Sequence, residues 1–246
     1  MVTIPVDNPV AAAATAAIHD GRVIDLRRML AEHPWLAGAR VGSDAPGAMS
    51  RTLLHVATDW PGHYPRVGAT IAALVQAGAD VNARFRGQHE ETPLHWAASS
   101  DDLEALDALL DAGADIDASG AVLGGGTPLA DACGFRQWTV ARRLVERGAR
   151  TTLRDAATLG LDDRVVAFLA ARPGPSAEEI DVAFWSACHG GRRDAAELLL
   201  EAGADVNVVP AWSDQTPRDA AADGGAYELV AWLTDRGGRS ATKPGE

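Results

Sequence analysis

The stretch Glu91–Asp117, ETPLHWAASSDDLEALDALLDAGADID, contains the pattern that the rest of the chain repeats. Thr92 followed by Pro93 predicts a helix start, because the hydroxyl can accept a hydrogen bond from an unpaired backbone N–H and proline suits the first helical position. A second helix is predicted to begin at Asp101-Asp102 and to end at Gly113, a residue typical of left-handed helix caps. Two helices this short cannot bury their apolar faces alone, so the unit predicts neighbours of the same kind.

Those neighbours recur at a constant internal spacing. The distance from the first alanine after the TPLH motif to the glycine that ends the second helix is 16 residues (113 − 97 = 16). TPLHWAA followed by LLDAGADID resembles the ankyrin repeat, which implies an all-α, ankyrin-repeat solenoid of helix-turn-helix units with short β-hairpin fingers. The same spacing joins Ala97 to Gly113, Ala132 to Gly148, Ala187 to Gly203 and Ala221 to Gly237.

We expect one ankyrin-repeat domain over residues 1–246. It comprises an N-terminal capping helix pair at 11–36, about six repeats over 50–239 and a frayed tail at 240–246. Repeat four is predicted to lack its finger, because Ala156 follows Ala132 by only 24 residues (156 − 132 = 24). In this alignment Arg154 occupies the position of the motif histidine in repeat four, and Trp185 occupies it in repeat five.

Composition limits the classes of partner. The net charge of −12 and the pI near 4.9 disfavour nucleic acid and anionic lipid, which both select basic surfaces. The chain has no run of 18 apolar residues and no basic region before its N-terminal alanines. We therefore expect neither a membrane span nor a signal peptide, and predict a cytoplasmic location. Composition also resembles that of short stand-alone bacterial ankyrin-repeat proteins.

Motifs for chemistry are absent from the sequence. GxSxG, GxxxxGK[ST], HExxH and CxxC do not occur, so we predict no cofactor and no metal site. Cys133 and Cys188 stand at equivalent positions of different repeats and are predicted to be small buried residues rather than a disulfide. The family resemblance implies that His55 and His95 are structural and tie their own repeat to the next.

The chain departs from the repeat pattern most clearly at Asp59–Gly68, DWPGHYPRVG. This insertion contains two prolines and two glycines and cannot continue a helix. It either folds over its own repeat or presents its aromatic residues to a ligand or partner. A long finger, Asn82–Glu90, follows in the next connection, and the two residues after each alanine pair line the concave face in ankyrin proteins. The candidate binding residues are therefore Asp59, Trp60, His63, Tyr64, Arg84, Phe85, His89, Trp96, Ser99, Ser100, Phe135, Trp185, His189 and Trp212.

The leading hypothesis is a binding protein that recognises a protein partner through its concave groove and finger loops, since Trp, Tyr and Arg are the residues on which such surfaces rely. The alternative is an enzyme of the isomerase, cyclase or hydrolase type, with a small molecule in a Trp-lined pocket. Its acid–base residues would be Asp59, His63 and His189. A purely scaffolding role is a third reading.

Overall fold

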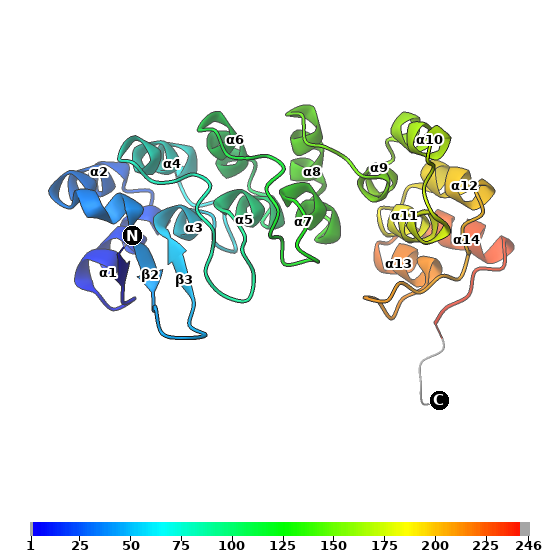
Figure 1. Cartoon of the computed structure of the whole chain (residues 1–246), viewed down its shortest axis with the longest axis horizontal. Helices are drawn as coiled ribbons and strands as arrows, with labels where there is room; N and C mark the ends of the chain where they lie inside the picture. Colours follow the sequence, from blue (N-terminus) through cyan, green and yellow to red (C-terminus); the bar gives the residue numbers. More distant parts are fainter. Residues whose placement is uncertain (1, 242–246) are drawn as a thin grey trace. The chain divides into compact units, whose positions relative to one another are not determined.

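The computed structural model describes residues 2–241 and is built mainly of helices (Figure 1). Contacts divide the chain into two compact units, Met1–Ala149 and Arg150–Glu246. Each unit is described by itself. The prediction of one domain spanning all the repeats therefore stays a prediction.

The first unit is a stack of helix pairs. In Figure 1 the shorter first helices α3, α5 and α7 form one row and the second helices α4, α6 and α8 form another, and helices pack on the equivalent helix of the next pair. A 3-10 helix, η1 (Pro34–Gly38), follows the first pair. The helices are α1 (Pro9–His19), α2 (Val23–Glu32), α3 (Leu53–Ala57), α4 (Val67–Gln76), α5 (Pro93–Ser99), α6 (Leu103–Asp111), α7 (Pro128–Gly134) and α8 (Trp138–Glu146).

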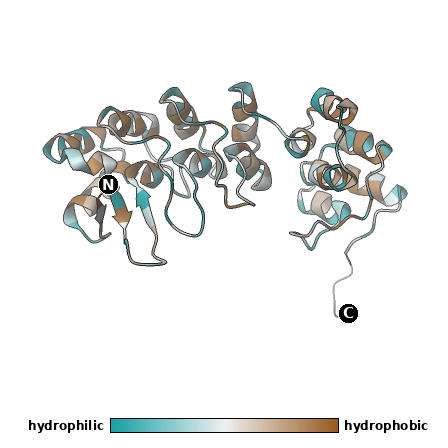
Figure 2. Ribbon diagram, in the orientation of Figure 1, coloured by the Kyte–Doolittle hydropathy of each residue, from teal (hydrophilic) through white to brown (hydrophobic). Residues whose placement is uncertain are grey.

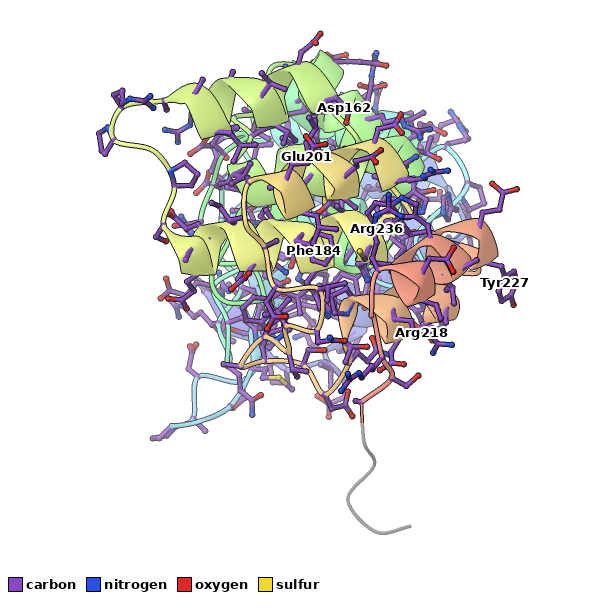
Figure 3. The ribbon with its side chains drawn as sticks, turned by 90° about the vertical axis from the view of Figure 1, so that its right-hand side faces the viewer. Asp162, Phe184, Glu201, Arg218, Tyr227 and Arg236 are labelled. Carbon is purple, nitrogen blue, oxygen red and sulfur yellow. The ribbon has the colours of Figure 1, made fainter. Side chains whose placement is uncertain are left out.

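The second unit has the same plan, with α11 packed against α9, α12 and α13. Phe184 on α11 is fully buried between the helices, whereas Tyr227 at the start of α14 is 75% exposed and points outward (Figure 3). The capping box that starts α11 is formed by Ser176 and Glu179, so this helix begins before the repeat pattern predicts. The helices are α9 (Leu153–Leu159), α10 (Asp162–Ala170), α11 (Ala177–His189), α12 (Arg193–Glu201), α13 (Pro217–Asp223) and α14 (Tyr227–Asp235).

Alanine and leucine side chains fill the space between the stacked helices. Leu94, Ala97 and Ala98 on α5 are fully buried, as are Leu106 and Leu109 on α6. Hydrophobic and hydrophilic segments alternate along the helices of both units, which is the pattern of helices with one face in a core (Figure 2). The predicted all-α fold of paired helices is confirmed.

Capping boxes begin most of the first helices. In α5 the Thr92 hydroxyl accepts a hydrogen bond from the His95 backbone N–H, and the His95 ring accepts one from the Thr92 backbone N–H. Thr52 and His55 form the same capping box at the start of α3. In α9 the partners are Thr152 and Asp155, so the assignment of Arg154 to the histidine position was one residue out of register. A carboxylate at this position can accept a hydrogen bond from the backbone N–H of the cap residue, as the imidazole does. Because aspartate replaces histidine here, the sequence alone does not show which residue closes the capping box.

A small sheet at the N-terminus was not expected. Its strands β1 (Thr3–Ile4), β2 (Arg40–Gly42) and β3 (Ser50–Thr52) lie in the order β1-β2-β3, parallel and then antiparallel. Arg40 is buried and donates to the carbonyl oxygens of Ser50 and Arg84, both at 2.7 Å. The hairpin between β2 and β3 precedes the first repeat motif, and this explains why the motif search missed it.

Later fingers are loops rather than extended hairpins. Outside the sheet, the described residues contain one isolated bridge, between Ser50 and Arg86. The predicted short connection into repeat four is present, since α8 ends at Glu146 and α9 begins at Leu153.

Three smaller expectations concern the tail, the cysteines and the membrane. The Ala241 amide donates to Asp219 at 2.7 Å, so the described start of the predicted frayed tail is bonded, while residues 242–246 lie outside the described residues. Cys133 and Cys188 are buried and not joined in a disulfide. None of the helices within residues 2–241 has the length and apolar character needed to cross a bilayer.

Candidate binding groove

The first unit contains a hollow of about 430 Å³ that we call the aromatic groove. Residues come to it from five segments: the α3–α4 loop, the two fingers that flank α5, α5 itself, and the end of α7. The groove therefore gathers many of the candidates that the sequence predicted, although they are spread over three repeats. Its lining residues are Asp59, Trp60, His89, Glu91, Trp96, Ser99, Ser100, Val122, Phe135 and Gln137.

Aromatic rings form much of the wall. Trp60 is 79% exposed and Phe135 is 43% exposed, whereas Trp96 is half-buried. The Trp96 indole is fixed by a hydrogen bond from Nε1 to Glu91 Oε2 at 3.0 Å and by contact with the Phe85 ring, 5.4 Å between centroids. The groove thus combines one oriented indole with two accessible rings, which is the composition of a recognition surface.

Two carboxyl groups lie next to each other here, and one of them, that of Glu91, lines the groove. Glu91 is 6% exposed, and Asp131 on α7 is fully buried. Burial, followed by the charge of Glu91, raises the pKa of Asp131 to about 8. The Leu123 backbone offsets only part of this rise in the pKa, and a hydrogen bond between the Asp131 and Glu91 side chains adds to it. We call Glu91 and Asp131 the carboxyl pair.

The predicted insertion folds onto the neighbouring repeat. The His63 amide donates to Asp102 Oδ2 at 2.6 Å, and the His63 ring bonds to the Ser100 carbonyl at 3.1 Å. Tyr64 stacks on His19 with ring centroids 4.3 Å apart. Neither His63 nor Tyr64 lines the groove. The middle of the insertion thus packs on the neighbouring repeats rather than on its own, while Trp60 stays exposed, and contact with a ligand or partner stays a prediction.

The finger candidates divide in the same way. Arg84 donates to the carbonyls of Glu90 and Ser119, and so braces one finger against the next. Phe85 is 8% exposed and supports Trp96 from behind. His89 alone of the three lines the groove. Sequence could identify the loop but not the direction of each side chain.

The remaining candidates, Trp185, His189 and Trp212, belong to the second unit. Together with Arg154 they form what we call the Trp212 cluster. Trp185 is buried, stacks on His189 at 5.3 Å and meets Trp212 edge-on at 6.5 Å. The Arg154 guanidinium lies over the Trp212 ring, 5.0 Å from its centroid. Trp185 Nε1 donates to the Gln215 carbonyl at 2.9 Å. This bond replaces the link to the next repeat that His55 makes in the first unit, where its ring reaches the Glu91 carbonyl at 3.1 Å.

The acid–base candidates have other partners. Asp59 forms an ion pair with Arg51, and His63 is bonded to the Ser100 carbonyl. His189 belongs to the second unit. Within residues 2–241, no three His, Cys, Asp or Glu side chains are grouped closely enough to hold a metal ion.

Two family models match the sequence. One, described as ankyrin repeats in three copies, covers residues 68–155, and another, described as an ankyrin repeat, covers residues 182–209. This chain is an ankyrin-repeat protein. Ankyrin repeats are generally modules for protein–protein interaction. Among solved structures, the ankyrin-repeat protein is similar to the crystal structure of the human ASB11 ankyrin repeat domain, with 28% identity, coverage of 78% of this chain and 90% of that one, and a TM-score of 0.45.

Sequence reasoning missed the carboxyl pair in this ankyrin-repeat protein. Asp131 occupies the position in TPLADAC that Trp96 occupies in TPLHWAA. An ionisable residue directly before the Ala132-Cys133 pair, in a segment that is otherwise apolar, was the available signal. Glu91 gave a weaker one, because a residue just before the cap threonine is usually in solvent.

Proposed function

We propose that the protein binds a protein partner through the aromatic groove of its first unit. The observation that carries this proposal is the exposure of Trp60 in a hollow whose other aromatic wall, Phe135, comes from two repeats further along the chain. Large exposed aromatic side chains grouped around a concave surface are typical of interaction sites, because they are costly to leave in water.

The rigidity of the surroundings supports the same conclusion. Asp102 and Ser100 hold the insertion, and Arg84 holds the fingers. A side chain that is already positioned loses less conformational entropy when a partner binds, so more of its contact energy contributes to affinity.

The test compares matched variants of the full chain. The Trp60→Ala/Phe135→Ala double variant removes the two accessible rings, and Tyr227→Ala removes an exposed ring of similar size from the second unit. Proteins captured by the wild type from its native extract are identified, purified and titrated against each variant by biolayer interferometry. We expect a loss of at least about tenfold in affinity for the double variant, equal to about 1.4 kcal/mol.

Two controls show whether the loss of affinity is specific to the groove. Tyr227→Ala should keep wild-type affinity, and circular dichroism should show the same helix content in all three proteins. A partner that binds the double variant as tightly as the wild type would show that the groove is not the interaction site.

The enzyme alternative gains no support from these contacts. Asp59 and His63 each have a different hydrogen-bonding partner, so the two are not arranged to pass a proton between them. A small-molecule ligand would be detected by the same titrations if the extract were first separated by size.

A further inference from the structure

The base of the aromatic groove carries negative charge that no cation of the protein matches. The influences on the Asp131 carboxyl are burial, Glu91 and the Leu123 amide, none of which is positive. The Glu91 carboxylate accepts from the neutral Trp96 indole. Within residues 2–241 neither carboxyl takes part in an ion pair, although buried acidic groups are normally paired.

Hydrogen bonding at the base is also incomplete. Both side-chain oxygens of Asp131 are buried and accept no hydrogen bond. Buried polar atoms without a partner are uncommon in folded proteins, and each needs a physical reason. Asp131 itself does not line the groove and its protonated carboxyl donates to Glu91, so the acceptor that a ligand with several N–H donors can reach there is the Glu91 carboxylate.

A guanidinium group meets both requirements. It is positive at all accessible pH values and carries five N–H donors in a planar fork, which suits recognition of carboxylates. Its flat face also stacks on aromatic rings. Trp60 and Phe135 supply accessible rings in the same hollow as Glu91. An ammonium group has the same charge but lacks the planar face that stacks on an aromatic ring.

We infer that the aromatic groove receives an arginine side chain of the partner protein, with its guanidinium between the Glu91 carboxylate and the rings of Trp60 and Phe135. The inference rests on the proposed function, because it names the chemistry that the same site selects. The unpaired charge of Glu91 in the groove lining and the accessible rings of Trp60 and Phe135 carry it.

Binding should also exchange a proton. In the free protein the raised pKa of Asp131 keeps this carboxyl protonated at neutral pH, which limits its repulsion with Glu91. When a guanidinium lies beside Glu91, its positive charge reduces the repulsion between the two carboxyl groups. Asp131 then loses its proton to solvent more readily. Other titratable groups near the pair are Asp59 and His89 in the groove wall, and His55 and His95 behind it. The pKa values of His55 and His95 are about 3 and about 4, so both stay neutral in this range.

The first experiment uses single amino-acid probes. Full-length protein labelled with nitrogen-15 is titrated with N-acetyl-arginine amide, its neutral isostere N-acetyl-citrulline amide, and N-acetyl-lysine amide. The indole N–H resonance of Trp96, assigned with Trp96→Phe, reports the state of Glu91 because the two are hydrogen-bonded. We expect the arginine probe to bind about tenfold more tightly than the citrulline probe, with the lysine probe between them.

Matched variants locate the charge. Glu91→Gln keeps the shape and an acceptor for Trp96, and Glu90→Gln removes the same charge from an exposed neighbouring residue. Glu91→Gln should weaken the arginine probe about tenfold, and Glu90→Gln by less than about twofold. Affinity of the wild type for this probe should rise between pH 6 and pH 8.5, and that of Asp131→Asn should not. Asp59 and His89 are present in both proteins, so their contributions to the affinity cancel.

Three results would overturn the inference: equal affinity for the arginine and citrulline probes, tighter binding of the lysine probe, or equal effects of Glu91→Gln and Glu90→Gln. None of them would contradict the proposed function. A partner that depends on Trp60 and Phe135 but binds Glu91→Gln normally would keep the groove as the site and reject arginine as its occupant.

Discussion

The aromatic groove of the first unit and the Trp212 cluster of the second show how one repeat position can serve two kinds of surface. In repeat two the motif histidine, His95, closes the capping box and its ring reaches the Gly126 carbonyl at 3.4 Å. In repeat five Trp185 reaches the Gln215 carbonyl instead. The link between repeats is kept, but the larger ring places an aromatic stack where the first unit has an open hollow.

The two sites also differ in charge. The carboxyl pair gives the aromatic groove a negative base, whereas the Trp212 cluster has the Arg154 guanidinium over an aromatic face. A cation already occupies the aromatic face in the second unit, while the rings of the first unit are open. This contrast teaches that aromatic content alone does not define the ligand, because the neighbouring charge decides what a ring can accept.

The largest expected effect concerns the link made by Trp185. Trp185→Ala removes a buried ring and a hydrogen bond to the next repeat, and should lower the free energy of unfolding by about 3–5 kcal/mol. Urea denaturation followed by circular dichroism measures it. Trp212→Ala, at a ring that is 54% exposed, is the matched control and should cost less than about 1 kcal/mol.

Trp185→His sharpens the comparison, because it restores the residue type found in repeats one and two. We expect a loss intermediate between wild type and Trp185→Ala, since the imidazole can keep the hydrogen bond to Gln215 but not the packing. If histidine is no better than alanine here, ring volume rather than the link holds repeat five to repeat six.

The next largest effect is a loss of folding stability at acidic pH, which we attribute to His55 and His95 in the first unit. Burial lowers the pKa of His55 to about 3 and that of His95 to about 4, whereas both would titrate near 6.5 in the unfolded chain. The unfolded state therefore binds more protons below pH 6.5, and stability is lost as the pH falls towards the folded pKa values. Together they should lower the free energy of unfolding by about 2 kcal/mol between pH 6 and pH 5.

His55→Gln/His95→Gln tests the source of that loss, measured as urea midpoints at the two pH values. The double variant starts less stable but should show a smaller fall, while His89→Gln should keep the wild-type fall. An unchanged pH dependence in the double variant would contradict the assignment.

The carboxyl pair should produce the opposite slope. Asp131 holds a proton in the folded state up to about pH 8 but loses it near pH 4 in the unfolded chain. The folded state therefore binds more protons between these values, and stability falls as the pH rises through this window. Asp131→Asn abolishes this cost and should gain stability relative to wild type by about 1 kcal/mol per pH unit between pH 5 and pH 7.

Asp155→Asn is the control in the second unit. Asp155 sits at a comparable depth but accepts two hydrogen bonds from Thr152, so its carboxylate is satisfied. This variant should lose stability at every pH in the range. A parallel response of the two variants would contradict the raised pKa of Asp131.

The smallest expected effect is at the cation of the Trp212 cluster. Arg154→Ala removes an exposed cation–π contact and should cost about 0.5–1 kcal/mol. Arg218→Ala, at another arginine on a first helix of the same unit, provides the baseline for losing a positive charge. The two variants are compared by thermal denaturation. Equal losses would mean that stacking on Trp212 adds nothing to stability.

Sequence by itself determined the repeat and its local caps. Threonine followed by proline starts a helix and glycine ends one through interactions within a few residues, so Thr92, Pro93 and Gly113 predict their structure without knowledge of the rest. The structural role of His55 and His95 was predictable for a similar reason, once the family resemblance was evident. The insertion at Asp59–Gly68 was found because it breaks the period.

Tertiary structure decided what each departure does. Trp60 and Phe85 both belong to aromatic loops, yet one is exposed and the other packs behind Trp96. The carboxyl pair joins residues 40 positions apart (131 − 91 = 40), and the raised pKa of Asp131 follows from burial and then from that contact. Direction, burial and pairing depend on how successive repeats stack, and a stacking interaction is a property of two surfaces that no single repeat sequence contains.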